Sequence, residues 1–308
     1  MTAAFSFRGV TKRFGKTTAL DGITLDAAPD RIIGLIGKNG SGKSTLLRHV
    51  VGLQLPTAGE CLTFGVPTPA LDAAELSRIG VVHQDDRFLT WMRADQMIRY
   101  VGSFYERWDA GLADRLARML ELDVSARIRS LSPGNIQKLA IILAVCHHPT
   151  LLLLDEPLSD LDPIAREATL ALILERFRSG DMTIVISSHI LRDVEQIVDS
   201  VICLDRGRLV THESLDALQE RYAEWVLAST DGLLPAAFTE PYVLEYSGNA
   251  HQARLVVRDP GAHEADFVRR HGVDVTRRPL NLERIFPLLI DHRRDRSPNA
   301  SEELAAWR

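Results

Sequence analysis

Cysteine is scarce in this sequence, which has three in 308 residues. Cys61, Cys146 and Cys203 are far apart along the chain and lack the paired spacing of metal ligands, and two of them lie in apolar runs, LAVCHH and VICLD. A disulfide scaffold or a cysteine metal site is therefore not indicated. We expect reduced, mostly buried cysteines that pack as small hydrophobic residues, the usual pattern of a cytosolic protein.

Long apolar segments are also missing. The longest strongly apolar stretches, such as LAIILAVC and LLLLDEP, fall far short of the roughly 18 to 20 residues that a membrane span needs. The first ten residues, MTAAFSFRGV, contain no long apolar segment after a basic start, so no secretory signal is indicated. We expect the chain to stay in the cytosol and to reach a membrane only through a partner.

The sequence also lacks a strong excess of either charge. The chain has 36 Lys and Arg against 41 Asp and Glu, a formal net charge of -5, so no global positive field argues for nucleic acid or anionic lipid. With 45% hydrophobic and 25% charged residues, the composition is that of an ordinary soluble globular protein. The length suits one large domain plus a small one, or about two average domains.

Several short apolar runs have the composition of buried strands. RIIGLIG precedes the helical pattern KSTLLRHVVGL, and LLLLDEP and TIVISSH stand on either side of a helical stretch at Pro163–Phe177. Strands that are apolar on both faces are typical of a parallel sheet covered by helices. Further on, VICLDRGRLV predicts a hairpin with its turn at Asp205–Gly207.

The same patterns predict how the chain divides. Helix-period apolar positions predict a mostly helical insert at about 88–148 within a first domain of residues 1–214. After that, short strands and helices alternate, which predicts a small α+β domain over 215–290. The last residues, 291–308, are polar and charged with no sustained period, so we expect a mobile tail.

The segment between RIIGLIG and the helix that follows it carries a phosphate-binding pattern. Gly37–Thr45 reads GKNGSGKST and fits GxxxxGK(S/T) between a strand and a helix, as this motif requires. Glycines let backbone N–H groups surround phosphates, Lys43 adds positive charge, and Ser44 offers a hydroxyl to Mg²⁺. We therefore predict a P-loop NTPase of the α/β class that binds Mg-ATP. The predicted phosphate ligands are Gly37, Asn39, Gly40, Ser41, Gly42, Lys43, Ser44 and Thr45.

Two carboxylates follow the apolar run LLLLDEP. Phosphoryl transfer depends on positioning and charge stabilisation, so hydrolysis requires one metal-directed and one water-directed carboxylate. We assign Asp155 to Mg²⁺ and Glu156 to the attacking water. Taken alone, this pair could equally be two carboxylates that cap a strand end, but together with the P-loop it favours the hydrolytic roles.

With these residues in place, the chain resembles the ATP-binding subunits of ABC transporters over about residues 5–215. Phe14 matches the family's adenine-stacking aromatic, and Gln84 matches the glutamine that joins metal, water and permease contact. The signature, usually LSGGQ in the family, corresponds to Ser132, Pro133, Gly134 and Asn135. Ser159–Asp162 resembles the D-loop, and His189 resembles the switch histidine.

The resemblance implies a sheet core with a helical subdomain and a composite site between two subunits. The P-loop of one subunit would face Ser132, Gly134 and Asn135 of the other, with Asp162 close by. ATP would close the dimer and hydrolysis would reopen it, which would drive an integral membrane permease from the cytoplasmic face. The coupling groove would lie near Leu89–Tyr105 and include Trp91 and Met92, although a core role for Trp91 is an equal alternative.

Two further segments, FYERWD and LNLERIFPLLI, resemble bacterial exporter-type ABC ATPases. An ordinary amphipathic helix that packs Leu282, Ile285 and Phe286 on its own domain explains the second segment equally well. The signature departs from the common pattern, because Pro133 replaces the first glycine and Asn135 the glutamine. Ser132 as N-cap and Pro133 as first helical residue would accommodate the change.

Two other functions compete with the exporter ATPase. A soluble ABC ATPase that acts on nucleic acid or ribosomes usually carries two ATPase cores, a long coiled-coil insert or zinc cysteines, and this sequence has one P-loop and none of these. A regulatory module that binds ATP without turnover would typically lack the residues that Glu156 and His189 provide. We therefore expect no nucleic-acid partner.

Overall fold

A computed structural model describes residues 3–84, 88–178, 182–229, 234–235, 237–249 and 251–294, with side chains described as far as residue 290. The chain forms two compact units, residues 1–212 and 213–308. Of the tail predicted at 291–308, the first four residues continue helix α10, and 295–308 lie outside the described residues.

The first unit is built on a six-stranded sheet with the order β10-β9-β3-β8-β7-β6. Its central strands are apolar and buried along their whole length, and β6, β7, β8, β3 and β9 pair in parallel. The parallel core predicted from LLLLDEP and TIVISSH is therefore confirmed. The strands are β3 (Ile32–Ile36), β6 (Ile79–Val82), β7 (Leu151–Asp155), β8 (Thr183–Ser187), β9 (Ser200–Asp205) and β10 (Arg208–Ser214).

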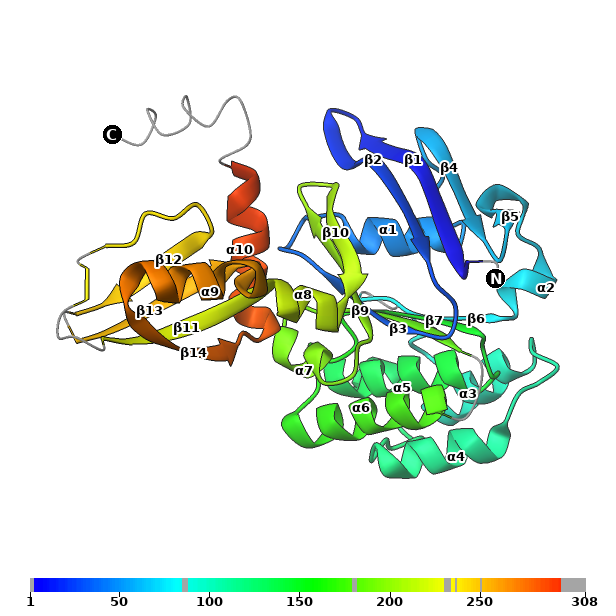
Figure 1. Cartoon of the computed structure of the whole chain (residues 1–308). Coiled ribbons are helices and arrows are strands. Elements are labelled where there is room, and N and C mark those ends of the chain that lie inside the picture. The colour runs from blue at the N-terminus through cyan, green and yellow to red at the C-terminus, as the bar shows by residue number, and fades with distance from the viewer. Residues whose placement is uncertain are drawn as a thin grey trace. The chain divides into compact units, whose positions relative to one another are not determined.

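A second, antiparallel sheet has the order β2-β1-β4-β5. It consists of β1 (Phe5–Phe14), β2 (Thr17–Ala27), β4 (Ala58–Thr63) and β5 (Val66–Pro67). Helix α1 (Lys43–Val50) lies between the two sheets, and Leu46, Leu47 and Val50 are buried in the shared core (Figure 1). The short α2 (Ala73–Leu76) and a 3₁₀ turn at Thr68–Ala70 connect β5 to β6.

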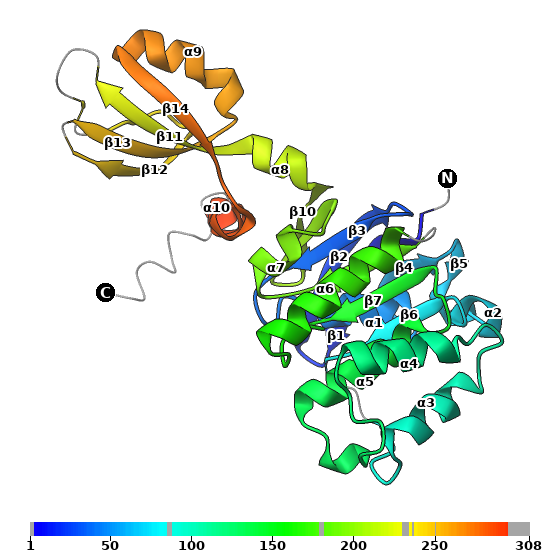
Figure 2. The ribbon, with the colours of Figure 1, turned by 90° about the horizontal axis from the view of Figure 1, so that it is seen from below.

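Helices lie on the opposite side of the parallel sheet, some against it and some against helix α5 (Pro133–Val145), and Figure 2 shows them from below. They are α3 (Ala94–Gly102), α4 (Ala110–Met119), α5, α6 (Pro163–Arg178) and α7 (Leu191–Glu195), with a 3₁₀ turn at Ile128–Ser130. Helix α5 is apolar nearly all round because it packs between β6, α3 and α4. Among the described residues, no helix has both the length and the apolar character that a bilayer crossing requires.

The second unit contains one antiparallel sheet of order β12-β13-β11-β14. Its core groups Trp225 with Phe267, whose ring centroids are 5.0 Å apart, and with Leu255 and Val257. In the last helix Leu282 and Ile285 are buried and Phe286 is half-buried. The elements are α8 (Leu215–Arg221), β11 (Tyr222–Ser229), β12 (Val243–Gly248), β13 (Gln252–Arg258), α9 (Pro260–His271), β14 (Val273–Pro279) and α10 (Leu282–Arg294).

Candidate functional site

The loop between β3 and α1 requires glycine at two points for packing reasons. A Cβ on Gly37 would come within 2.5 Å of the Leu204 carbonyl oxygen, and one on Gly42, at φ +107°, within 2.6 Å of the Ala19 carbonyl oxygen. Gly42 is also the N-cap of α1, and no side chain caps this helix. The first N–H groups of α1 therefore remain available to an anion, which is the arrangement that binds phosphate.

Lys43 carries the positive charge of this loop and is buried. Its Nζ donates a hydrogen bond to the Gly37 carbonyl at 2.9 Å and lies 3.6 Å from Glu156 Oε1, with both side chains 7% exposed. Beside it, the buried Ser41 Oγ has no hydrogen-bond partner among the described residues. A buried hydroxyl without a partner costs free energy, so these residues fit an oxygen-rich ligand such as a phosphate chain.

The two predicted carboxylates lie at the carboxyl end of β7, next to the end of β8. Asp155 pairs in register with Ser187, whose Oγ donates to Asp155 Oδ1 at 2.7 Å and accepts from the Glu156 backbone N–H at 2.8 Å. Asp155 is only 1% exposed. Ser187 therefore fixes both the side chain of one carboxylate and the backbone of the other.

Glu156 and His189 form the outer part of the cluster. Glu156 has the left-handed backbone conformation, at φ +51°, which is uncommon and strained for a residue with a side chain. Its Oε2 accepts from the His189 backbone N–H at 3.2 Å and lies 2.7 Å from His189 Nδ1. Because a carboxylate only accepts, Nδ1 carries a proton in this contact, and the half-exposed ring presents Nε2 elsewhere.

The other predicted residues are not bonded to this cluster in the part of the chain that the structure describes. No hydrogen bond or ion pair recorded for the described residues joins Phe14, Gln84 or Ser132 to Lys43, Asp155 or Glu156. Phe14 is 48% exposed at the end of β1, and Gln84 is exposed two residues beyond β6.

The signature segment forms the exposed start of α5. Ser132 is the N-cap, and its Oγ accepts from the Asn135 N–H at 3.2 Å, while Pro133 begins the helix. The cap that we expected is therefore confirmed. Gly134 lies against the D-loop segment, since a Cβ there would meet the Asp160 carbonyl at 2.6 Å. Asp162 caps the first turn of α6 through the Ala165 N–H at 2.9 Å, which lowers the pKa of its carboxyl.

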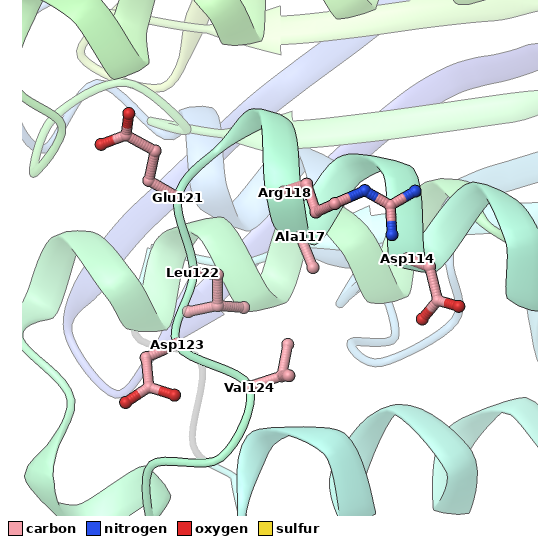
Figure 3. A pocket seen from close by; sticks show the side chains of 7 residues that line it. All are labelled: Asp114, Ala117, Arg118, Glu121, Leu122, Asp123 and Val124. Atoms are coloured by element: carbon pink, nitrogen blue, oxygen red, sulfur yellow. The ribbon is translucent and has the colours of Figure 1, made fainter.

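A pocket at the end of α4 is separate from all of these residues (Figure 3). Leu122, Val124 and Ala117 supply apolar side chains, and Asp114, Arg118, Glu121 and Asp123 supply charged ones of both signs. It contains neither a glycine loop nor a buried cation. The features that favour phosphate binding, an uncapped helix start and a buried lysine, lie at the β3–α1 loop instead.

Sequence reasoning missed Ser187. The signal was present, because Ser187 and Ser188 interrupt an otherwise apolar strand immediately before His189. A hydroxyl at the end of a buried strand that is adjacent to a carboxylate strand needs a polar partner. That partner could be assigned only once the β7–β8 pairing was known.

A phosphate-binding loop, an uncapped helix start and a carboxylate pair at the end of a parallel sheet define a P-loop nucleoside triphosphatase. Residues 20–159 match the family model described as "ABC transporter". The "Nod factor export ATP-binding protein I" of Cupriavidus metallidurans is 31% identical over 93% of this chain and 97% of its own length. The protein of the same name from Rhizobium etli is 30% identical over 92% of each chain.

Solved structures agree with the sequence relatives. The structure of an ATP-binding subunit of an ABC transporter has a TM-score of 0.63 at 25% identity, covering 70% of this chain and 92% of that one. A dimeric ATP-binding cassette in a post-hydrolysis state with ADP and Pi has a TM-score of 0.61 at 26% identity, covering 68% and 98%. The chain belongs to the ABC transporter ATP-binding subunits and is an ATPase.

Proposed function

We propose that this subunit pairs with a second ATPase subunit and powers a separate membrane permease that works as an exporter. The observation that carries the ATPase mechanism is the cluster at the carboxyl ends of β3, β7 and β8. There Lys43, Asp155, Glu156, Ser187 and His189 are joined by contacts of 2.7 to 3.6 Å. This edge of a parallel sheet is where such folds bind their ligands.

Within one subunit, the loop holds the phosphates of ATP through its backbone N–H groups, Ser41 and Lys43. Ser44 and Asp155 offer the hard oxygen ligands that Mg²⁺ prefers, with Gln84 as a further contributor. Mg²⁺ supplies charge neutralisation on the phosphoryl oxygens. Lys43 leaves its present neighbours, the Gly37 carbonyl and Glu156, as it binds phosphate.

Glu156 then positions the attacking water and accepts its proton. Ser187 holds the backbone of Glu156, and His189 holds its carboxylate, so the group has little freedom to turn away. His189 donates from Nδ1 to Glu156 and directs Nε2 toward the γ-phosphate. The contacts from Ser187 and His189 together hold Glu156 in the geometry that proton transfer requires.

The second half of each site comes from the other subunit. Ser132, Gly134 and Asn135 stand at the start of α5, and Ser132 is exposed. An exposed helix start favours an anion, here the γ-phosphate bound by the partner. The dimeric cassettes among the solved relatives support this pairing.

The permease docks on the helical region that contains α3. Trp91 and Phe104 are each 68% exposed, and Tyr100 is 45% exposed. Such exposure argues against a core role for Trp91, and aromatic residues are enriched in protein interfaces. Export is proposed because the relatives at 30% and 31% identity are named export ATP-binding proteins. The subunit would then work at the cytoplasmic face of the membrane.

Substitution of the water-positioning carboxylate tests the ATPase mechanism. Glu156→Gln keeps the shape of the side chain but removes its capacity to accept a proton. We expect ATP binding and ATP-dependent dimerisation to persist while turnover falls at least about 100-fold. Glu167→Gln, an exposed change on α6, is the matched control. Turnover near the wild-type rate in Glu156→Gln would remove this role from Glu156.

Substitution of exposed aromatics tests the permease proposal. Trp91→Ala with Phe104→Ala should reduce the fraction of the subunit that co-sediments with membranes containing its permease, without changing ATPase activity of the free subunit. Met119→Ala, an exposed apolar position on α4, is the control. Equal membrane association of the wild type, the double variant and Met119→Ala would contradict docking at the region that contains α3.

A further inference from the structure

Phe14, which matches the family's adenine-stacking aromatic, is 48% exposed at the end of β1. The Nζ of Lys12, two residues earlier on β1, lies over one face of its ring, 5.0 Å from the ring centroid. The register of β1 against β2 shifts between Lys12 and Arg13, so this contact belongs to an irregular end of the strand. An ammonium within about 6 Å of an aromatic centroid is attracted to it.

The Lys12 ammonium is itself held in place. Its Nζ donates to the Leu55 carbonyl at 2.8 Å, in the segment that follows α1. The same segment is tied to β1 by two more hydrogen bonds, from the Thr57 N–H to the Thr11 carbonyl at 2.7 Å and from the Arg13 N–H to Thr57 Oγ1 at 3.0 Å. The cation is therefore attached to a fixed backbone rather than left free in solvent.

This arrangement addresses a cost that an exposed aromatic otherwise incurs on binding. A half-exposed ring at the end of a hairpin strand loses rotamer freedom when a flat ligand stacks on it, which reduces affinity. A cation fixed on one face lowers that loss in advance, because it favours one orientation of the ring. It also leaves a single face for the ligand.

We propose that Lys12 is a positioning residue for the base of the nucleotide: it fixes the Phe14 ring so that the open face receives adenine. This inference rests on the ATP binding of the proposed function and on the adenine stacking that the family resemblance implies for Phe14. It concerns the base alone, since the phosphate contacts belong to the Gly37–Thr45 loop. Lys12 therefore contributes to affinity for ATP but not for a bare phosphate chain.

The test compares a nucleotide with its phosphate part alone. Dissociation constants of Mg-ATP and of inorganic triphosphate with Mg²⁺ are measured by calorimetry on the full chain. Lys12→Met keeps most of the side-chain length but removes the charge, and should weaken ATP binding about three- to fivefold while triphosphate affinity stays unchanged. Lys12→Arg should restore ATP affinity, and Lys16→Met, an exposed lysine in the adjoining turn, should have no effect.

Three results would overturn the assignment. ATP and triphosphate affinity could fall by the same factor in Lys12→Met, which would place the effect in α1 and its loop. ATP affinity could also stay at the wild-type value. Finally, Lys12→Met could weaken ATP as much in a Phe14→Leu background as in the wild type, which would show that Lys12 does not act through the ring.

Phe14→Ala separates this inference from the proposal beneath it. If Phe14→Ala leaves ATP affinity intact, adenine does not stack on Phe14. The stacking role of Phe14 and the positioning role of Lys12 are then both wrong. If Phe14→Ala weakens ATP but Lys12→Met does not, only the role of Lys12 falls. The ATPase assignment is untouched in either case, because Glu156→Gln tests it independently.

Discussion

The two halves of the proposed nucleotide site differ in how far one chain completes them. The phosphate half is buried, with Asp155 at 1%, Glu156 at 6% and Lys43 at 7% exposure, and its groups are bonded to one another. The signature half is a helix start whose exposed Ser132 bonds only to its own first turn among the recorded contacts. The phosphate half is therefore preformed within one chain, whereas the signature half is a solvent-exposed surface.

Solvation explains the difference. Buried charges are costly unless they are paired, so Lys43, Glu156 and Asp155 must have partners within the chain before any ligand arrives. A helix start in water needs only a cap, which Ser132 supplies, and its remaining N–H groups can be solvated. If the site opens and closes between two subunits, as proposed, this asymmetry suits it, because the solvated half can separate at low cost.

The largest predicted effect comes from removal of the buried cation. Lys43→Ala should reduce ATP affinity at least about 100-fold, since a buried charge beside the phosphates contributes far more than an exposed one. Calorimetric titration with Mg-ATP measures it. Lys38→Ala, an exposed lysine in the same loop, should bind ATP nearly as the wild type does. Intact affinity in Lys43→Ala would mean that the site has been assigned to the wrong loop.

A smaller loss should follow when the link between the two carboxylates is cut. Ser187→Ala removes the donor to Asp155 and the acceptor of the Glu156 N–H, which leaves buried groups unpaired. We expect turnover to fall about tenfold and the free energy of unfolding to fall by about 1 to 3 kcal/mol.

The neighbouring hydroxyl provides the control for that change. Ser188 Oγ accepts from the Ile190 N–H at 2.9 Å and does not contact the carboxylates. Ser188→Ala should therefore cost stability without a comparable loss of turnover. Steady-state ATPase rates and denaturant unfolding are measured for Ser187→Ala and Ser188→Ala. Equal ATPase rates in the two variants would contradict the orienting role of Ser187.

The sequence predicted the residues of the phosphate half better than the contacts that join them to neighbouring elements. The glycine loop, Lys43 and the Asp155–Glu156 pair carry strong local patterns, and the apolar runs around them predicted the parallel core. The Ser187 link depends on which strand lies beside β7, and the tight packing of Gly134 on Asp160 depends on a contact between α5 and the D-loop. Such contacts join residues 26 to 32 positions apart, so no local pattern could specify them.

The signature half should respond more weakly to substitution. Pro133 has no N–H, so Pro133→Gly would add one backbone donor at the start of α5, where the phosphate of a partner would lie. In a Glu156→Gln background, in which we expect ATP to stay bound, dimerisation should strengthen about three- to tenfold, in line with one added hydrogen bond. Sedimentation with Mg-ATP measures the change.

A matched proline separates this effect from general loosening of a helix start. Pro260 also begins a helix, α9, in the second unit. Pro260→Gly should reduce stability slightly and leave dimerisation unchanged. If Pro133→Gly also left dimerisation and ATPase rate unchanged, the departure from the common signature would have no bearing on closure of the dimer.

The smallest predicted effect is on the pH dependence of stability. It comes from His147, which follows the other end of α5 and is 3% exposed. Its ring stacks on Tyr105 with centroids 4.1 Å apart, and Nε2 lies 3.2 Å from the Ile79 carbonyl oxygen of β6. Burial lowers the pKa of His147 below the ordinary value of 6.5. The unfolded chain therefore binds a proton that the folded chain excludes, so stability is present above about pH 6.5 and is lost as the pH falls toward the folded pKa.

His147→Gln removes this titration, so its unfolding free energy should fall less steeply between pH 7 and pH 5. The difference is at most about 1.4 kcal/mol per pH unit, the value for one proton. Denaturant unfolding of the full chain at several pH values measures it, with the exposed His251→Gln as control. No hydrogen bond or ion pair recorded for the described residues joins α5 to Lys43, Asp155 or Glu156, so ATP affinity at pH 7.5 should stay at the wild-type value. A parallel loss of ATP affinity would mean that the two halves are coupled through α5 within one chain.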